Sequence, residues 1–539
     1  MTRSDSLRHR SRFVALLILA VATNSSSSSG QSALSFSLKY GPHTVGYRSH
    51  EMYDRTRNIP KDTVAVTGEP VSRPRPRPIH VSVWYPARKR PGTRPMTYGD
   101  YLHLFARPLH FASSDDAGAR TAEEEVARWP MLLVRNPGVR IPERREVLKA
   151  SIARERNVPT HAFRNAPPND GAYPIVIYTA GQDGPSFEND VLMEYLASHG
   201  YIVFGVPCWG EAGSFFLDTR SLEATSRDIE FVLAHARGLP GQASQRAALM
   251  GWSCGGMASV TVASRNASVD AVVGLDASIR YLYSNDALRA MFAPPRPYST
   301  PTLFLEQGNS LMRDLARAGA DTVFTFFDSL RYADAYVVTL KNLRHQNFAS
   351  MYVRLAGAQP FAFTADPVLA SAGYETVAKY AVTFLDAYLK NDGAARTLLA
   401  SRPHDLGLPD TNLAIVRKQA RRPLPTMAGF TSALTERGWD RVAEVISRVK
   451  ASDPDYTIDP DSLENAGIRF VESERLSEGV GLYRLYSLLH PADPRAWNGL
   501  GEAFEQRADT ANAVASFREA LRLRPENGRA ANGLKRLAK

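Results

Sequence analysis

The chain has 539 residues, 44% of them hydrophobic and 22% charged, with a formal net charge of +10 at pH 7. This is the composition of an ordinary globular protein, and the length allows two or three domains. The positive charge is spread along the chain, and its densest patch, residues 73–78 (RPRPRP), contains no aromatic residue. These features argue against a nucleic-acid partner, whereas peripheral contact with an anionic membrane surface stays open.

Residues 1–22 have the pattern of a secretory signal peptide. Arginines precede an apolar run over residues 13–22, which ends in the small-x-small triplet Ala20-Val21-Ala22. This run is too short to span a bilayer as a helix. The sequence therefore predicts a secreted or periplasmic protein, or a membrane-anchored one if the signal is not cleaved, and no further membrane span is expected.

Further along the chain, residues 44–47 and 80–85 have strand-like patterns and are predicted to form an opening antiparallel pair. A long insertion follows at residues 88–172. Helical segments alternate there with proline-rich turns, and they cover residues 98–105, 122–133 and 144–155. An insertion of this length could cover a site as a lid or be a peripheral decoration, and both interpretations stay open.

The next section alternates short apolar strands with amphipathic helices, which is typical of a parallel sheet covered on both faces. The predicted strands are 174–178, 202–206, 247–251, 271–276, 302–306 and 335–340. The predicted helices are 188–198, 220–236 and 374–389, with a further helix after Ser253. The sequence thus predicts an α/β domain over residues 34–392.

After residue 392 the pattern changes, with a predicted linker at 393–425 and only helical periodicity over 426–539. Eight residues fall on the 34-residue tetratricopeptide pattern: Trp497, Leu500, Gly501, Phe504, Ala513, Phe517, Ala520 and Pro525. A second frame lies one period upstream, and a degenerate helix pair at 430–449 precedes it. We predict an all-α array of two to two and a half helical hairpins. Such an array could hold a protein or peptide partner or brace the first domain.

The segment Gly251-Trp252-Ser253-Cys254-Gly255 carries a GxSxG pattern between an apolar run and a helix-compatible segment. Such a turn lifts a serine clear of the sheet, and its glycines leave room for the strained backbone. The free amides at the start of the following helix point at the same spot. The pattern favours Ser253 as a nucleophile over an ordinary glycine turn.

A serine nucleophile needs a base and a third group that orients the base. In sheets of this kind the chain order is serine, acid, histidine. Two histidines follow Ser253 in the α/β part of the chain. His345 comes shortly after the strand 335–340 and is favoured, whereas His404 lies beyond the closing helix and is interpreted as a surface residue.

The acid has two candidates, because Asp276 and Glu306 end successive predicted strands after the nucleophile helix. The residues alone do not separate them. An oxyanion hole needs two preorganised donors, and we expect the N–H of Cys254 and the N–H of Gln182, in the turn 180–184, to supply them.

Cys208 and Cys254 are the two cysteines of the chain. A single pair in a secreted protein could be bridged, but both lie at ends of predicted core strands, where two small buried thiols are favoured. The sequence has no CxxC motif or histidine cluster typical of a metal site. Neither a metal nor another cofactor is expected.

Several segments carry a resemblance to a known family: GPHTVGYRSHEMYD, HVSVWYPA, PIVIYTAGQDG, EYLASHGYIVFGV, GWSCGG, VVGLDAS and RHQNF. Together they resemble the intracellular type II and plasma platelet-activating-factor acetylhydrolases and their bacterial relatives. The resemblance runs from about Leu38 to Leu389 and does not cover the helical repeats. It implies an α/β-hydrolase fold and cleavage of short or oxidised acyl chains from phospholipid esters without metal or cofactor.

The resemblance also implies residue roles. The acid falls on Asp276 in an LDA-like context, which decides against Glu306, and the base falls on His345 in an HQNF-like motif. The oxyanion amides fall on Gln182 and Cys254. The sequence departs from the family at Ala180-Gly181, where His-Gly is usual, and at Cys254, where a larger apolar residue is usual. Substrate specificity therefore does not follow from the resemblance.

The expected function is that of a secreted serine carboxylic ester hydrolase that acts through an acyl-enzyme. A peptidase of the same fold is one alternative, with the helical repeats holding the peptide. A binding protein with a vestigial hydrolase half is another, and the intact order of serine, aspartate and histidine argues against it.

Overall fold

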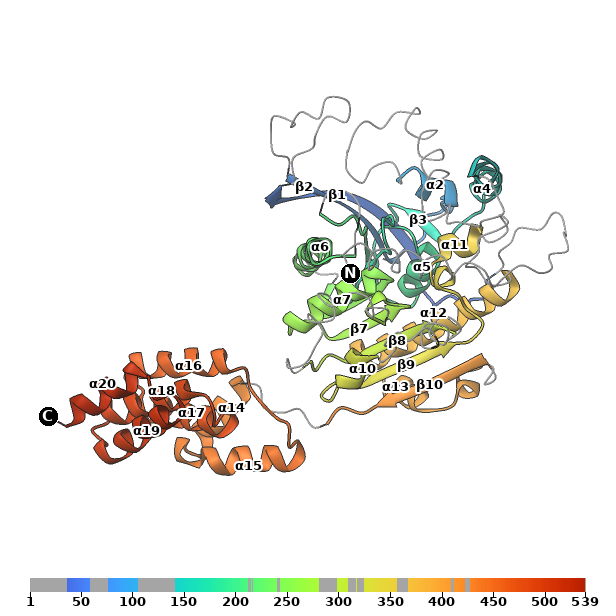
Figure 1. Ribbon diagram of the computed structural model, residues 1–539. Coiled ribbons are helices and arrows are strands. Elements are labelled where there is room, and N and C mark those ends of the chain that lie inside the picture. The colour runs from blue at the N-terminus through green and yellow to red at the C-terminus, as the bar shows by residue number, and fades with distance from the viewer. Residues whose placement is uncertain are drawn as a thin grey trace, which may run out of the picture. The chain divides into compact units, whose positions relative to one another are not determined.

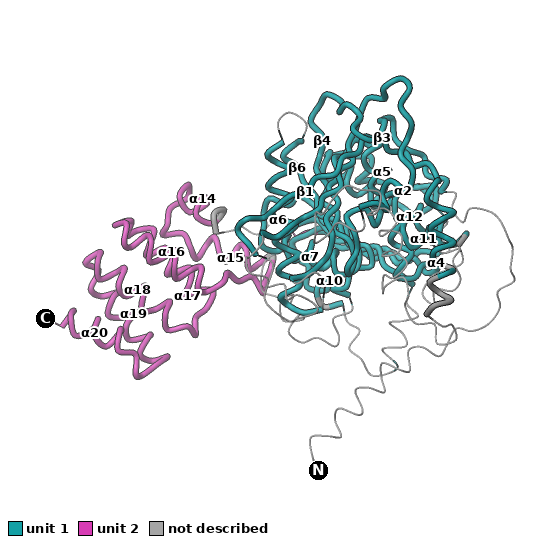
Figure 2. Tube along the Cα trace, turned by 90° about the horizontal axis from the view of Figure 1, so that it is seen from above, with its two compact units in different colours: residues 1–293, 300–419 teal, residues 294–299, 420–539 magenta. Residues whose placement is uncertain are grey.

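The computed structural model describes residues 36–58, 76–104, 141–211, 215, 217–239, 243–280, 298–308, 317, 324–355, 367–408, 412–421 and 427–538. The predicted signal at 1–22 and the predicted helix at 122–133 lie outside these residues. The chain divides into two compact units (Figure 2). One comprises residues 1–293 and 300–419, and the other comprises residues 294–299 and 420–539.

The first unit is built on one sheet, to which ten strands of the described chain contribute, in the order β10-β9-β8-β7-β6-β4-β5-β2-β1-β3. The strands are β1 (Thr44–Asn58), β2 (Pro76–Ala87), β3 (Ala162–Arg164), β4 (Tyr173–Thr179), β5 (Ile202–Val206), β6 (Ala243–Trp252), β7 (Ala271–Leu275), β8 (Thr302–Gln307), β9 (Ala335–Leu340) and β10 (Leu413–Lys418). Strands β5, β4, β6, β7, β8 and β9 run parallel. The flanking β2 and β10 are antiparallel to their neighbours β5 and β9.

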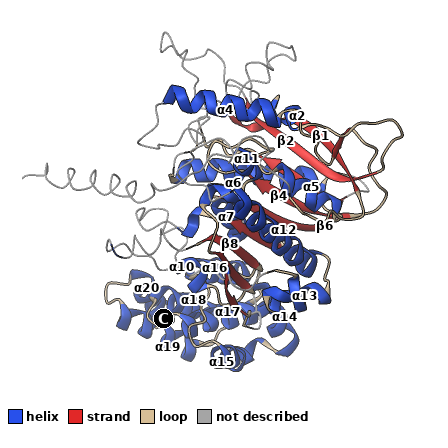
Figure 3. Cartoon of the chain, turned by 90° about the vertical axis from the view of Figure 1, so that its right-hand side faces the viewer, coloured by secondary structure: helices blue, strands red, loops and turns tan. Residues whose placement is uncertain are grey.

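Helices cover both faces of this sheet (Figures 1 and 3). The longer ones are α5 (Asp190–Ser198), α6 (Thr219–Arg237), α7 (Cys254–Arg265) and α12 (Pro367–Leu389). Helix α6 packs beside α7, and α5 contacts α12. Strands covered on both sides are apolar along their whole length, and every residue of β5 and β7 is buried. The predicted α/β-hydrolase architecture is confirmed.

Strands β5 and β9 begin and end where the sequence predicts, because a continuous apolar run marks each. The predicted linker at 393–425 is wrong over most of its length, since it contains α13 (Gly393–Ala400), the 3-10 helix η3 (Pro403–Leu406) and β10. Strand β10 pairs with β9 at the edge of the sheet, and it alternates half-buried with exposed residues. A short edge strand with one solvent-exposed face lacks the continuous apolar run that predicts a central strand.

The described part of the 88–172 insertion joins the other edge of the sheet. It contains α2 (Tyr98–Leu102), α4 (Ile141–Glu155) and β3, which pairs in parallel with β1. The indole N–H of Trp84, on β2, donates to the hydroxyl of Tyr101 at 2.8 Å. These residues therefore share the core of the first unit.

The second unit is all-α. It consists of α14 (Met427–Arg437), η5 (Trp439–Arg441), α15 (Val442–Ser452), α16 (Pro460–Glu472), α17 (Leu476–Leu489), α18 (Pro494–Gln506), α19 (Thr510–Leu523) and α20 (Gly528–Leu537). Helices α16–α17 and α18–α19 form two successive hairpins, and α14–α15 is the degenerate pair before them. The predicted all-α repeat domain is confirmed.

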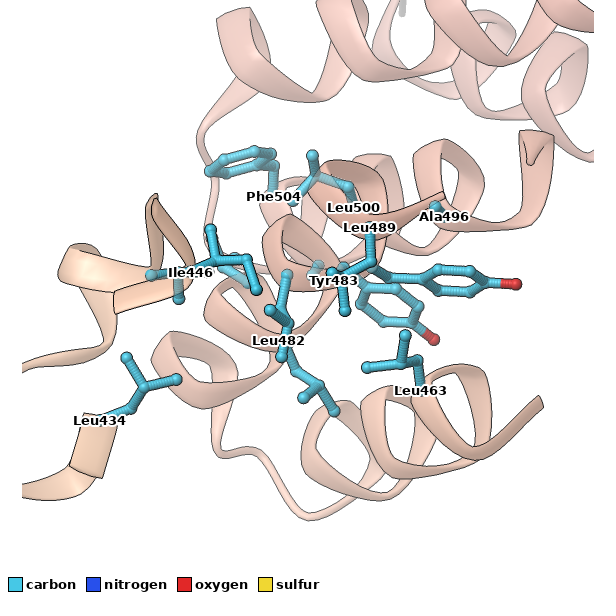
Figure 4. Packing of buried hydrophobic residues seen from close by; sticks show 14 of the residues in the cluster. Leu434, Ile446, Leu463, Leu482, Tyr483, Leu489, Ala496, Leu500 and Phe504 are labelled. Carbon is cyan, nitrogen blue, oxygen red and sulfur yellow. The ribbon is translucent and has the colours of Figure 1, made fainter. Parts of the chain in front are cut away.

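Close helix packing in the second unit depends on small residues facing large rings. The ring of Tyr483 lies where a Cβ at Gly467 or Gly499 would be, and the ring of Phe517 lies against Gly501 and Gly533 in the same way. Leu463, Leu482, Leu500 and other apolar residues complete this core (Figure 4). Burial of apolar surface is thus what stacks the hairpins. Among the described helices of the chain, none combines the length and apolarity that a membrane crossing requires.

Candidate active site

Ser253 lies on a sharp turn between β6 and α7. Its backbone has φ 56° and ψ −123°, a conformation that costs free energy for a residue with a side chain and persists only where packing enforces it. The glycines on either side allow this packing, because a Cβ at Gly251 would clash with Gly255 and a Cβ at Gly255 would clash with the carbonyl oxygens of Thr179 and Ala180. The turn has the geometry of a nucleophile elbow and lies at the carboxyl edge of the sheet.

Three predicted side chains meet at this edge. The Nε2 atom of His345 lies 3.0 Å from the Oγ of Ser253, and its Nδ1 atom lies 2.5 Å from Oδ2 of Asp276. His345 begins the 3-10 helix η2 (His345–Phe348), shortly after β9. With Nδ1–H donating to Asp276, Nε2 can accept the Ser253 proton. The side chain of His345 is 23% exposed and Ser253 is 9% exposed, so the reacting atoms lie in a partly sheltered position.

Asp276 follows β7 and is fully buried. Its Oδ1 accepts a hydrogen bond from the backbone N–H of Gln307 at 3.1 Å, and its Oδ2 accepts one from the Gln307 side chain at 3.0 Å. These two donors fix the plane of the carboxyl group. Asp276 can therefore hold the imidazole of His345 in one orientation.

Glu306 takes a different position, although it also ends a strand. Neighbouring side chains of a strand point to opposite faces, so Gln307 faces Asp276 while Glu306 pairs with Arg280, with 3.5 Å between Nε and Oε2. Burial raises the pKa of Glu306 to about 8, and Arg280 opposes this shift. The geometry thus separates the two acids that the residues alone leave open.

The other histidine, His404, lies in η3 with its side chain 86% exposed. This exposure agrees with the prediction that His404 is a surface residue.

The two amides expected to form the oxyanion hole follow the ends of the neighbouring strands β4 and β6. Cys254 is the first residue of α7, so its N–H has no acceptor within the helix. In the turn 180–184, the other four amides donate to oxygens of the protein: those of Ala180, Gly181, Asp183 and Gly184. The structure records no acceptor for the N–H of Gln182 among the residues it describes. Both amides are therefore available to a ligand.

Three residues at the site were not found by sequence reasoning. The hydroxyl of Ser278 lies 3.2 Å from the Oγ of Ser253, and Gln307 anchors Asp276. The indole N–H of Trp252 donates to the backbone carbonyl of His345 at 2.9 Å, and the two rings lie 4.9 Å apart. The only signal for Trp252 and Ser278 is their closeness in sequence to Ser253 and Asp276, and no motif marks Gln307.

Cys208 and Cys254 are free, buried thiols. Their sulfur atoms are 3.3 Å apart. Burial, together with the hydrogen bond to Cys208, raises the pKa of the Cys254 thiol well above its usual value. Within the described ranges, no group of three or more His, Cys, Asp or Glu side chains is arranged to hold a metal ion.

Comparison with known proteins gives two similarities. No family model matches the chain. The tetratricopeptide repeat domain-containing protein PYG7, chloroplastic, of Arabidopsis thaliana is 31% identical over 61 residues, which are 11% of this chain and 20% of that protein. This chain therefore spans about a fifth of that relative. Among solved structures, the ferulic acid esterase from Streptomyces cinnamoneus is similar with a TM-score of 0.48 and 17% identity, over 71% of this chain and 98% of the esterase chain.

Proposed function

We propose that this chain is a serine hydrolase that cleaves carboxylic esters through a covalent acyl-enzyme. The single observation that carries the proposal is the hydrogen-bonded line from Ser253 through His345 to Asp276, with Ser253 on a strained elbow. A strained backbone at a buried turn is costly. Its coincidence with a base and a buried acid supports a catalytic role.

In the acylation step, the Oγ of Ser253 attacks the carbonyl carbon of the ester while its proton passes to Nε2 of His345. The carbonyl oxygen becomes an oxyanion, which accepts hydrogen bonds from the N–H groups of Gln182 and Cys254. Asp276 stabilises the imidazolium that forms. When the C–O bond to the alcohol breaks, His345 donates the proton to the departing oxygen.

In the deacylation step, water takes the place of the alcohol. His345 removes a proton from the water as the water oxygen attacks the acyl carbon of the ester on Ser253. The same two amides stabilise the second oxyanion. Collapse of this intermediate releases the carboxylic acid, and the proton on His345 returns to the Oγ of Ser253.

For the substrate, we propose a phospholipid-type ester with a short acyl chain, and a secreted or periplasmic enzyme that contacts membranes peripherally. The support is the resemblance of residues 38–389 to platelet-activating-factor acetylhydrolases and the signal-like residues 1–22. The helical repeats would hold a protein or peptide partner or brace the first unit.

The test compares wild type with Ser253→Ala on p-nitrophenyl acetate. Ser253→Ala should lose the esterase activity and keep its melting temperature, because the hydroxyl makes contacts only at the site. Unchanged turnover would overturn the proposal. A series of p-nitrophenyl esters of increasing chain length measures acyl preference, and p-nitroanilide peptides distinguish a peptidase, which would turn them over, from an esterase, which would leave these amides intact.

A further inference from the structure

Glu188 is a buried carboxyl that the two reaction steps above do not use. It lies between the turn 180–184 and α5 and has no exposed surface. Its Oε2 accepts hydrogen bonds from the N–H of Gly181 at 2.8 Å and from the hydroxyl of Tyr178 at 3.0 Å. Burial raises the pKa of Glu188 to about 8. A carboxyl is therefore an expensive group to keep at this position.

The backbone that Glu188 holds is the one that presents the Gln182 N–H. The orientation of this N–H depends on the backbone rotations at Gly181, and a glycine restricts these rotations less than any other residue. Only glycine fits at 181, because a Cβ there would clash with the indole ring of Trp252. Within the turn, the Gly184 N–H donates to the Gly181 carbonyl at 2.8 Å, and from outside the turn Glu188 accepts the Gly181 N–H. These two contacts together fix the backbone at Gly181, next to the oxyanion donor.

The same segment also holds the backbone that follows His345. The carbonyl oxygen of Glu188 accepts the N–H of Met351 at 3.1 Å. The side chain of Asn189 accepts the N–H of Ser350 at 2.9 Å and donates to the carbonyl of Phe348 at 3.0 Å. Residues 188 and 189 therefore connect the oxyanion turn with the end of η2, the helix that begins at the base.

We propose that Glu188 is a positioning residue, whose carboxyl holds Gly181 so that the Gln182 N–H points at the carbonyl oxygen of the bound ester. This inference rests on the proposed ester hydrolysis. Glu188 acts through Gly181 and Gln182 and does not touch the substrate itself.

The proposal predicts a loss of kcat with little change in KM. A misdirected Gln182 N–H stabilises the oxyanion less, but the neutral ester of the ground state depends little on it. Removal of one oxyanion donor costs about 10²–10³ in kcat. We expect a loss of about 10- to 100-fold, because the donor is misaligned and not removed.

Three substitutions test whether an acceptor oxygen at the right distance from Gly181, and not the carboxyl group as such, is what matters. Glu188→Gln keeps a carbonyl oxygen at the same reach and should retain kcat within about threefold. Glu188→Met removes the acceptor and should show the full loss of kcat. Glu188→Asp keeps the carboxyl group but is one methylene too short to reach Gly181, so it should resemble Glu188→Met. If Glu188→Met does not fold, the comparison of Glu188→Asp with Glu188→Gln still decides.

Glu194 provides a matched control on α5. It is also buried, and it also accepts one tyrosine hydroxyl and one backbone N–H, from Tyr101 at 2.7 Å and from His161 at 2.8 Å. Its backbone donor lies in the insertion and not in the turn 180–184. Glu194→Met should lower the melting temperature about as much as Glu188→Met and leave the kcat of the folded enzyme unchanged.

The measurement is the kcat and KM of the full chain on p-nitrophenyl acetate, with melting temperatures for every variant. Equal kcat in Glu188→Met and Glu194→Met, or a failure of Glu188→Gln to exceed Glu188→Asp, would overturn the inference while Ser253→Ala remained inactive. Equal turnover in wild type and Ser253→Ala would instead overturn the proposed function, and the inference with it.

Discussion

The two units of the chain use their buried residues differently. In the first unit, the carboxyl edge of the sheet holds Ser253 and Asp276 with positive φ and two buried glutamates whose pKa burial raises to about 8. In the second unit, the core cluster consists of apolar side chains, and its positive-φ residues other than glycine, Glu474 and Ala508, lie in turns between helices. Strained backbone and buried carboxyl groups occur where chemistry is proposed, and regular apolar packing characterises the repeats.

The largest expected effect is the loss of kcat caused by Asp276→Asn in the first unit. The amide cannot hold Nδ1–H of His345 in the same way, so the imidazole takes the wrong tautomer and kcat should fall by about 10⁴. The check is the hydrolysis rate of p-nitrophenyl acetate. Glu306→Gln is the matched control, and it should leave kcat within about threefold, since Glu306 pairs with Arg280. A larger loss in Glu306→Gln than in Asp276→Asn would reverse the roles of the two acids.

A smaller effect, confined to the second unit, should follow from Phe517→Ala. Phe517 is fully buried against Gly501 and Gly533, and the loss of such a ring costs about 3–5 kcal/mol. Unfolding monitored by circular dichroism should show a lower transition for the repeats, while kcat on p-nitrophenyl acetate stays unchanged. If kcat falls in parallel with the stability of the repeats, the repeats brace the catalytic unit and the separation of roles is wrong.

The last effect concerns how the free energy of unfolding depends on pH, and it is the smallest when counted per pH unit. Glu306 pairs with Arg280, and burial holds its folded pKa at about 8, above the ordinary value of 4.5. Between these values Glu306 is protonated in the folded chain and ionised in the unfolded chain. Its contribution to the free energy of unfolding is therefore fully present below pH 4.5 and is lost as pH rises to about 8. Glu306 contributes up to ~1.4 kcal/mol per pH unit. Urea unfolding from pH 5 to pH 8 should therefore show a shallower decline for Glu306→Gln than for wild type. Parallel curves would mean that Glu306 is not protonated in the folded chain.

The parts of the fold that the sequence reveals are those with a strong local signal. Strands β5 and β9 are continuous apolar runs, and the turn at Ser253 needs glycines at fixed positions. Strand β10 has no such run because one of its faces is exposed. The sequence pattern of residues 393–425, which contain this strand, therefore predicts a linker.

The sequence predicts less of the candidate site than of the fold. Ser253 and His345 could be proposed from chain order, but Asp276 and Glu306 both end strands, and their difference depends on which face each side chain takes. Glu188 resembles an ordinary acidic residue at the start of a helix. Its role depends on hydrogen bonds from Tyr178 and Gly181. A sequence pattern cannot show which residues a buried side chain contacts in the folded chain.

The measurement that tests the central claim most directly is labelling of the purified chain with a fluorophosphonate, followed by mass spectrometry of its peptides. The proposed geometry predicts one phosphonyl group per chain, attached to the Oγ of Ser253, and greatly slowed labelling in Asp276→Asn. Labelling at another residue, or equal labelling of wild type and Ser253→Ala, would contradict it.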